Sequence, residues 1–290
     1  MLYDKVNYYF RKIYKFLELK FWNYISFIYF SQKNKKLKEI IHKNRKFLNA
    51  HKTFILKDEY KKNDFGIPKH IFENINKPIN NRLTYSDLIP FLIASYKKSE
   101  VNYLEIGVSV LKNFMQINEN LKNSNLVAYD INDIANSFTG DFELSHPNLY
   151  TSIKGENTLH FFKGDVLNKN DIKMFKHHLN KKYDFVMSDA MHTKEGIISE
   201  YENIISGSLN SNFIIYYDDL DFPELLNAAK KIANDLSKNH QNLSFFTFWI
   251  SGWVGNHEKM HKNGIISNLP IKDILKKEKI KLPFMREINF

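Results

Sequence analysis

The 290-residue chain contains no cysteine. It therefore cannot form a disulfide, use a thiolate nucleophile, or hold zinc or an iron–sulfur cluster through cysteine. A chain without disulfides fits a reducing compartment, and we expect a cytoplasmic protein. Hydrophobic residues make up 43% of the chain and charged residues 26%. These proportions are ordinary for a globular protein, and the length is sufficient to bury a sizeable core.

Long hydrophobic runs are also missing. The most apolar early stretch, residues 21–30, has half the length that a membrane-spanning helix needs. No short apolar segment is followed by the small-residue cleavage site of a secretory signal. The aromatic side chains of residues 21–30 could lie in a membrane interface beside lysines, but we expect them to pack against the rest of the protein.

The charge is unevenly distributed. The chain has a formal net charge of +10, and residues 1–62 alone hold 16 Lys and Arg against five Asp and Glu. The remainder is close to neutral. Two interpretations stay open for the basic segment: lysine-rich helix faces exposed to water, or contact with an anionic partner such as a phospholipid surface or nucleic acid.

The apolar pattern divides the chain near residue 80. Apolar residues recur at three- and four-residue spacing over residues 3–30 and 33–49, which predicts two helices. Glycine and proline interrupt the pattern before residue 80. We therefore predict a basic, aromatic-rich helical segment over residues 1–80 and a second domain over residues 81–290.

The second domain alternates short apolar runs with amphipathic stretches. Alternation of this kind predicts an α/β fold with right-handed crossovers and a mostly parallel sheet. The expected strands are residues 102–106, 126–129, 159–163, 183–188 and 212–217, and the expected helices are residues 84–98, 111–122, 169–180, 194–206 and 222–237.

The last part of the chain lacks a long helix between its apolar runs. Residues 244–250 and 264–267 predict two strands that pair antiparallel at the edge of the sheet. The expected total is seven strands, five of them parallel.

The first expected strand leads into Y-L-E-I-G-V-S-V at residues 103–110. A glycine at the end of such a strand lets the backbone turn sharply and approach a ligand closely. This segment resembles the first motif of class I S-adenosylmethionine-dependent methyltransferases, E/D-x-G-x-G-x-G. Glu105 and Gly107 match it, whereas Ser109 and Leu111 stand at the other two glycine positions. That departure argues against a dinucleotide, whose pyrophosphate needs several close backbone approaches.

The resemblance implies a Rossmann-like fold and a site for S-adenosylmethionine at Glu105, Gly107 and Ser109. Asp130 ends the second strand, where a carboxylate can accept both ribose hydroxyls of a nucleoside, with Asp133 as the alternative. Asp165 follows the third strand and matches the family position that contacts the adenine amino group. These carboxylates fall at the strand ends where such sheets bind ligands.

The fourth and fifth strands lead into D-A-M-H at residues 189–192 and D-D at residues 218–219. With them, residues 84–267 resemble small-molecule O-methyltransferases, most closely the methyltransferase domain 24 and cephalosporin-hydroxylase-like groups. In metal-dependent relatives the carboxylates at these strand ends hold a divalent ion. The resemblance assigns that role here to Asp189, Asp218 and Asp219, with Mg²⁺ as the expected ion.

Methyl transfer to oxygen needs a deprotonated, oriented hydroxyl, which a divalent cation can supply. His192 lies three residues beyond Asp189 and could be either a metal ligand or the general base. Asp189 and His192 are therefore the expected catalytic residues.

The expected function is O-methylation of a small-molecule or sugar hydroxyl. The chain has no P-loop, no H-E-x-x-H, and no Asn- or Asp-Pro-Pro-aromatic tetrapeptide. The last absence argues against methylation of a nucleic-acid base. Two alternatives stay open: a methyltransferase acting on a polyanionic acceptor such as RNA or a glycolipid, and a non-catalytic Rossmann-like binding module. We expect residues 1–80 to contribute to the acceptor site or to contacts in a homo-oligomer.

Overall fold

The computed structural model describes residues 34–62, 82–97, 100–252 and 260–290, with a few helical positions between 17 and 25. The predicted helix over residues 3–30 lies largely outside the described residues, and so does the predicted boundary near residue 80. Of the helices that are described, none is long and apolar enough to cross a membrane.

Except for the α-helix at Ile271–Lys277, which was not predicted, the described α-helices match the expected helices in type and differ mainly in length. The predicted helix at residues 33–49 extends further, and the one at residues 194–206 ends in a π-helical turn at Tyr201–Ile205. Their bounds are α2 (Lys35–Lys62), α4 (Tyr85–Tyr96), α5 (Lys112–Asn118), α6 (Lys169–His178), α7 (Lys194–Glu200), α8 (Pro223–Ser237) and α9 (Ile271–Lys277).

One sheet runs through the described part of the protein, with strand order β10-β8-β9-β7-β6-β1-β2-β5-β4-β3. The pairs within β5-β2-β1-β6-β7 are parallel, and β9 and β8 follow antiparallel. The strands are β1 (Asn102–Ile106), β2 (Asn125–Asp130), β3 (Glu143–His146), β4 (Leu149–Lys154), β5 (Asn157–Lys163), β6 (Tyr183–Ser188), β7 (Leu209–Tyr217), β8 (Ser244–Ile250), β9 (His261–Ser267) and β10 (Arg286–Glu287).

The predicted α/β sheet, its five parallel strands and its antiparallel edge pair are confirmed. The sheet has ten strands rather than the seven expected, because β3, β4 and β10 were not predicted. β3 is exposed at every position and β10 has only two residues. Such strands carry little of the apolar alternation on which a prediction depends.

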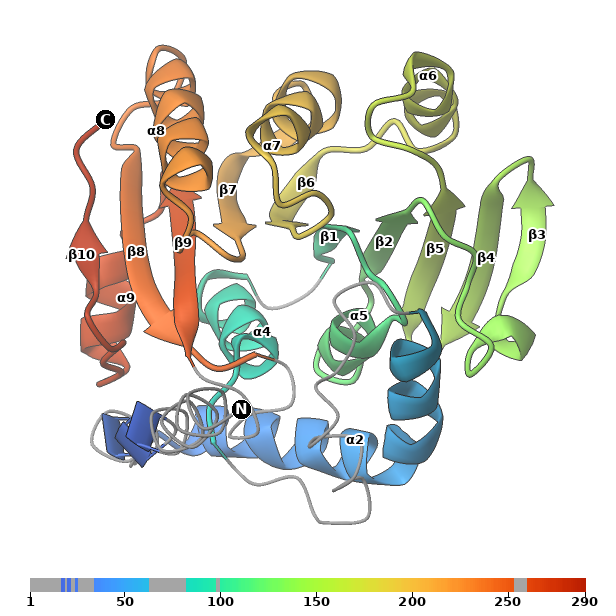
Figure 1. Ribbon diagram of the computed structural model, residues 1–290, viewed down its shortest axis with the longest axis horizontal. Helices are drawn as coiled ribbons and strands as arrows, with labels where there is room; N and C mark the ends of the chain where they lie inside the picture. The colour runs from blue at the N-terminus through green and yellow to red at the C-terminus, as the bar shows by residue number, and fades with distance from the viewer. Residues whose placement is uncertain are drawn as a thin grey trace, which may run out of the picture.

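Helices cover both faces of the sheet, as Figure 1 shows: α6, α7 and α8 on one face, α4 and α5 on the other, with α2 lying across the outside of the second layer. The central strands are therefore buried on both sides. In β1, Tyr103 packs into the core beneath α4 and α5, and its neighbour Leu104 packs into the core beneath the opposite layer. Side chains that alternate in this way are typical of a strand between two helical layers.

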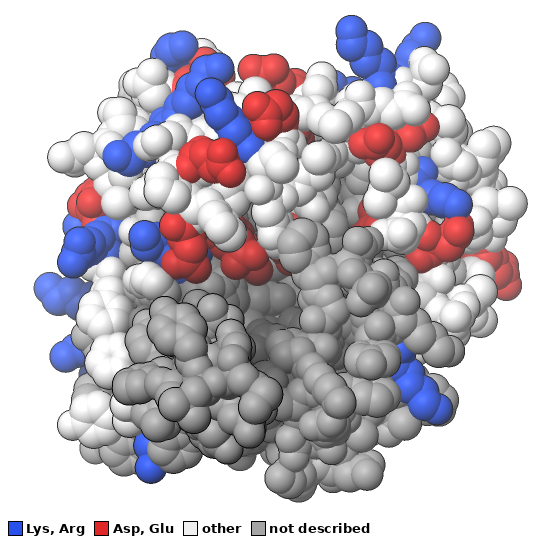
Figure 2. All heavy atoms as spheres, in the orientation of Figure 1, with Lys and Arg blue, Asp and Glu red and all other residues white. Residues whose placement is uncertain are grey.

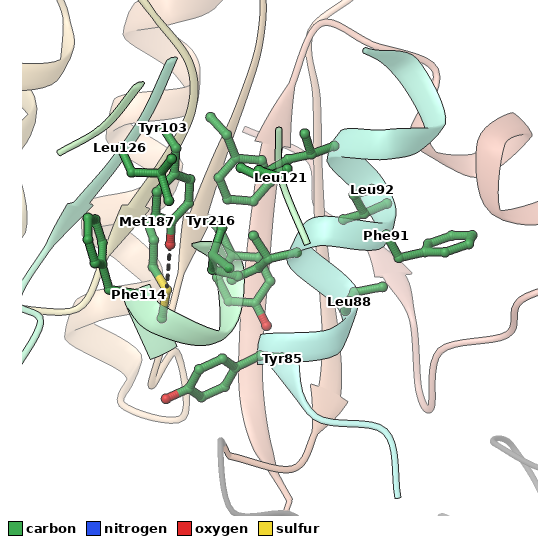
Figure 3. Packing of buried hydrophobic residues seen from close by; sticks show 14 of the residues in the cluster. Tyr85, Leu88, Phe91, Leu92, Tyr103, Phe114, Leu121, Leu126, Met187 and Tyr216 are labelled. Atoms are coloured by element: carbon green, nitrogen blue, oxygen red, sulfur yellow. Dashed lines mark hydrogen bonds between the residues drawn. The ribbon is translucent and has the colours of Figure 1, made fainter. Parts of the chain in front are cut away.

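Helix α4 is anchored at its start and buried along most of its length. Thr84 caps the helix, and its backbone N–H donates to Asp87 at 2.9 Å. Pro90 lies inside the helix, in its second turn. Figure 3 shows α4 beside the buried sheet residues Tyr103, Met187 and Tyr216, with the side chain of Phe91 pointing away from them on the other side of the helix.

Helix α2 joins this core through a buried ion pair. Arg45 is 3% exposed and Asp87 is fully buried, and their side chains lie 2.6 Å apart. Asn44 donates to the same carboxylate at 2.8 Å. Leu37 and Leu48 of α2 belong to the hydrophobic core that also contains sheet residues. Residues 37–48 of the predicted helical segment therefore pack directly on the second domain and hold α4 in place.

Candidate functional site

A cleft of about 390 Å³ opens at the carboxyl ends of the parallel strands. Its walls come from the ends of β1, β2, β5, β6 and β7, with additional residues from α4, α5 and β9. The lining includes Gly107 and the following residues with polar or charged side chains: Tyr85, Glu105, Ser109, Lys112, Asn113, Asp130, Asp165, Asp189, His192, Asp218, Asp219 and His261. All of the predicted site residues therefore line one cleft.

Gly107 lies where the β1 turn meets the loop after β6. Its φ of +86° is a conformation that residues with a side chain rarely adopt, and a Cβ atom here would lie 2.3 Å from the carbonyl oxygen of Asp189. Its N–H donates to the carbonyl of Tyr129 at 2.8 Å. Glycine is required at this point for both its backbone angle and the space it leaves.

The residues at the two missing motif glycine positions have backbone angles that glycine adopts readily. Ser109 has φ of +47° and Leu111 has φ of +61°, so both adopt the left-handed conformation that glycine tolerates best. Left-handed backbone in residues with a Cβ is strained, and strain of this kind concentrates at functional sites. The loop therefore keeps a turn that glycine would adopt at lower cost.

Glu105 lies beneath this loop. It is 1% exposed and accepts hydrogen bonds from the Tyr103 hydroxyl at 2.6 Å and from the Asn113 amide at 2.9 Å. Burial raises the pKa of Glu105 to about 8, against the opposing effect of these bonds.

Asp130 is held by four hydrogen bonds. One carboxylate oxygen accepts from the backbone N–H groups of Val108 and Ser109 at 2.9 and 2.7 Å, and the other accepts from the backbone and side chain of Asn132 at 2.8 and 3.0 Å. It therefore fixes the β1 loop against the end of β2. The alternative residue, Asp133, pairs with Lys163 at 2.7 Å on the surface and is not part of the cleft wall.

Asp165 lines the same end of the cleft. It accepts from the N–H of Leu167 at 2.8 Å, and its own N–H donates to Asp171 at 2.9 Å. Like the carboxylate of Asp130, that of Asp165 accepts from a backbone N–H group.

At the other end of the cleft, His192 bridges two carboxylates. Its Nε2 lies 3.2 Å from Oδ1 of Asp189, and its Nδ1 lies 3.1 Å from Oδ2 of Asp219. Both ring nitrogens can donate only when the imidazole is protonated. Burial alone would lower the pKa of His192, but the bond to Asp189 and the charges of both carboxylates raise it to about 9.

The same carboxylates influence one another. Burial and the charge of Asp218 raise the pKa of Asp189 to about 6, and they also raise the pKa of Asp219. The neighbouring Asp218 has a lowered pKa, because the charge and hydrogen bond of His261 outweigh the effect of burial. Asp219 has φ of +51°, so the loop after β7 is strained where it carries these side chains.

His261 was not predicted. It begins β9, and its Nε2 lies 2.6 Å from Oδ1 of Asp218, which also accepts from the Asn263 amide at 2.6 Å. One sequence signal could have found it: an antiparallel strand that follows β7 in the sheet must begin where β7 ends. Polar residues at its first positions therefore meet the strand end that carries Asp218 and Asp219.

Asp218, Asp219 and His261 each offer a ligand atom, and these three atoms lie within 4.8 Å of one another. Among the described residues, this group is therefore compact enough to hold one metal ion. Asp189 is joined to it through His192 and through the charge of Asp218.

A second buried acid lies behind the Asp189 loop. Glu200 at the end of α7 is fully buried and accepts from the Ser188 hydroxyl at 2.5 Å, and the Met191 backbone also hydrogen-bonds it. Burial raises the pKa of Glu200 to about 8.

No protein-family model and no curated protein sequence matches this chain. Among solved structures it is similar to an O-methyltransferase from Bacillus cereus in complex with SAH, at 12% identity and a TM-score of 0.47, covering 86% of this chain and 99% of that one. It is also similar to the plantazolicin methyltransferase BpumL in complex with SAH, at 17% identity and a TM-score of 0.44, covering 79% and 99%. A spermidine synthase from Thermotoga maritima is similar at 12% identity and a TM-score of 0.39, covering 69% and 66%.

The order and direction of the strands identify the fold. Five parallel strands in the order β5-β2-β1-β6-β7 are followed by β9 and then β8, both antiparallel to their neighbours. The chain has the class I methyltransferase fold. From β1 the chain adds β2 and β5 on one side and then β6 and β7 on the other. Sheets of this kind bind ligands at the carboxyl ends of the strands where the strand order switches sides, and the cleft opens at that place.

Proposed function

We propose that the protein is an S-adenosylmethionine-dependent methyltransferase that methylates a hydroxyl group of a small molecule. The observation that carries this proposal is the division of one cleft into two chemically distinct ends. All of these residues line the cleft, and the strand order divides them. Residues at the ends of β1, β2 and β5 line one end (Gly107, Asp130 and Asp165), and residues that follow β6 and β7 or begin β9 line the other (Asp189, His192, Asp218, Asp219 and His261).

The first end, which we call the cofactor half, fits a nucleoside. Its carboxylates at the ends of β2 and β5 suit ribose hydroxyls and an exocyclic amine, and about 390 Å³ is within the range of small-molecule sites. Ribose hydroxyls would take over the bonds that Asn132 now makes with Asp130. S-adenosylmethionine, when bound, supplies an electrophilic methyl group on a sulfonium.

The second end, which we call the acceptor half, can orient a hydroxyl and remove its proton. Burial and the charge of Asp218 raise the pKa of Asp189 to about 6, which makes its carboxylate a stronger base than an ordinary aspartate. This value is still below neutral pH, so the carboxylate is mainly ionised there. The protonated His192 lies beside it and supplies positive charge next to the oxygen that loses its proton. Asp189 thus accepts the proton, and His192 orients Asp189 and stabilises the developing negative charge.

The donor set of the acceptor half also fits a divalent cation. Asp218 and Asp219 offer carboxylate oxygens within 4.8 Å of each other, and the charge of Asp218 helps to raise the pKa of the nearby Asp189. Asp218 and Asp219 are two of the three ligands that the resemblance implied, and Mg²⁺ accepts such oxygen donors. A bound divalent ion would lower the pKa of the acceptor hydroxyl and hold it in place.

The cofactor assignment can be tested by isothermal titration calorimetry with S-adenosylmethionine and its demethylated product, with and without Mg²⁺. Asp130→Ala removes two charge-assisted bonds to the ligand, and we expect cofactor affinity to fall at least about a hundredfold. Asp133→Ala is the matched control, because Asp133 is exposed and pairs with Lys163 outside the cleft wall. Equal cofactor affinity in the two variants would contradict the role of Asp130.

The two alternatives from the sequence make different predictions in the same experiment. A non-catalytic binding module would bind neither ligand while keeping its fold. A polyanionic acceptor would give binding to RNA or glycolipid that weakens steeply with salt. Figure 2 shows Lys and Arg side chains interspersed with Asp and Glu across the described part of one face. Many of the basic residues 1–62 lie outside the described part of the chain, so their partner stays a prediction.

A further inference from the structure

We propose that His261 is a nitrogen ligand of a divalent ion held with Asp218 and Asp219, and that it makes the site select Mn²⁺, Co²⁺ or Zn²⁺ over Mg²⁺. This inference rests on the proposed function, because it assigns the metal of the same acceptor half. It changes the expected ligand set by adding a residue from β9, and it leaves Asp189 available to accept a proton.

Strand geometry directs His261 into the site. His261 and Asn263 are two positions apart at the start of β9, so their side chains point to the same face of the sheet. Both reach Oδ1 of Asp218 at 2.6 Å. Asn263 is itself held by the hydroxyl of Tyr216, and the His261 ring meets the ring of Tyr85 edge-on with centroids 6.2 Å apart. The imidazole is therefore fixed from two sides.

The loop that carries the two carboxylates is attached to the same strand. Leu220 donates its N–H to the carbonyl of Lys262 at 2.7 Å, and Lys262 donates its N–H to Asp221 at 3.1 Å. Residues 218–221 and the first residues of β9 thus form one bonded unit. A metal held by Asp218, Asp219 and His261 would join parts that already have a fixed relative position, as a preorganised site requires.

The spacing of the donors fits a shared ion. Two neighbouring ligands at right angles, each 2.0–2.2 Å from a metal, lie about 3 Å apart. Nε2 of His261 and Oδ1 of Asp218 are 2.6 Å apart, so a shift of a few tenths of an ångström accommodates the ion. The metal would replace the proton that now lies between these two atoms.

The other histidine of the cleft is placed differently. Both nitrogens of His192 lie against carboxylates, Asp189 on one side and Asp219 on the other. It is a bridge between the proton-accepting residue and the metal group, whereas only His261 belongs to the cluster whose three ligand atoms lie within 4.8 Å. The two histidines therefore provide a matched pair for an experiment.

A nitrogen ligand changes which ion is preferred. Mg²⁺ takes oxygen donors and keeps several waters, whereas imidazole suits first-row transition metals and Zn²⁺. Two carboxylates with one imidazole make a ligand set in which Mn²⁺, Co²⁺ and Zn²⁺ gain over Mg²⁺.

The test is pulsed electron paramagnetic resonance of the full-length protein loaded with Mn²⁺, reading the echo modulation from nitrogen bonded to the metal. We expect directly bonded nitrogen in the wild type and in His192→Gln, and its loss in His261→Gln. Calorimetry on the same samples should give Mn²⁺ binding at least about tenfold weaker in His261→Gln, with Mg²⁺ binding changed much less. Wild-type protein labelled with ¹⁵N only in histidine should show the isotope shift, which keeps the test valid if His261→Gln does not fold.

Several outcomes would overturn the assignment: bonded nitrogen that persists in His261→Gln, that disappears in His192→Gln, or that is absent from a wild type that binds Mn²⁺. Titration with S-adenosylmethionine separates this inference from the proposed function. A protein that binds the cofactor but no divalent ion refutes the metal site and leaves the methyltransferase proposal in place. A protein that binds Mn²⁺ through nitrogen but binds no cofactor refutes the methyltransferase proposal and leaves the metal site in place.

Discussion

The two halves of the cleft are built from similar residues and organised in opposite ways. In the cofactor half, Asp130 is held by backbone and amide N–H groups, and so its charge is already balanced by dipoles. In the acceptor half, Asp189, Asp218 and Asp219 are balanced mainly by the imidazoles of His192 and His261. The first arrangement fixes geometry, whereas the second keeps groups whose protonation can change near neutral pH. Binding needs the former and proton transfer needs the latter.

The largest expected loss of stability comes from a substitution at the contact between the two halves, where Gly107 meets the backbone of Asp189. Gly107→Ala introduces a Cβ 2.3 Å from the Asp189 carbonyl and forces alanine to φ of +86°, and we expect about 3 kcal/mol or more of destabilisation. Gly155→Ala is the control, because Gly155 also has a positive φ but no atom within 4 Å of a new Cβ. It should cost about 1 kcal/mol. Urea unfolding of both variants measures the difference, and equal losses would show that the contact has no effect.

The acid behind the acceptor half gives a pH-dependent effect. Glu200 has a folded pKa of about 8, above its ordinary value of 4.5. The unfolded chain therefore loses this proton first as pH rises, and Glu200 reduces stability progressively between about pH 4.5 and 8. Glu200→Gln should remove this loss and be more stable than wild type at pH 8 by on the order of a few kcal/mol, with little difference near pH 4.5. The exposed neighbour Glu202, changed to Gln, should leave the pH profile of thermal unfolding as it is in wild type.

The charge balance of the acceptor half can be measured on His192. Asp189→Asn removes the carboxylate that contributes most to raising the pKa of His192, so this pKa should fall from about 9 toward its ordinary value of 6.5. Asp219 remains as a partner, so the fall should be incomplete. NMR titration of the imidazole in metal-free protein checks this, with Asp221→Asn as a control outside the bridge. An unchanged His192 pKa in Asp189→Asn would show that the bridge does not form in solution.

The smallest expected effect concerns the cofactor half. Ser109→Gly and Ser109→Ala both remove the hydroxyl, but only glycine adopts φ of +47° without strain. We expect the glycine variant to be more stable than the alanine variant by up to about 1 kcal/mol, after the larger entropy of unfolded glycine is counted. Chemical denaturation resolves this difference. If alanine is the more stable variant, the loop at residue 109 does not have the left-handed turn described here.

The sequence predicted strand bounds correctly where the local apolar pattern alone marks the start and end of the strand. β1, β6 and β8 have the predicted bounds, because their apolar runs end abruptly at polar or glycine residues. The predicted carboxylates line the cleft because parallel strands that point the same way end at the same edge.

The features that were not predicted depend on contacts between distant segments. His261 reaches Asp218 across 43 positions, and no local pattern around His261 signals that pairing. The bridging position of His192 was also missed, because it requires the loops after β6 and β7 to approach each other. The two missing motif glycines suggested a larger departure from the motif than the backbone shows. Ser109 and Leu111 differ from the motif in residue type but keep positive φ angles, which residue identity alone does not reveal.

The close approach of Gly107 to the Asp189 carbonyl has a consequence for the order in which ligands bind. A ligand that displaces the β1 loop in the cofactor half must also displace the backbone that carries Asp189, since no space separates them. Binding of the two ligands is then thermodynamically linked. If the first ligand changes the affinity for the second by some factor, the second changes the affinity for the first by the same factor. We expect the affinity for the acceptor to differ between the free and the cofactor-bound protein. The free energies of the two separate titrations should therefore not add up to that of the ternary complex.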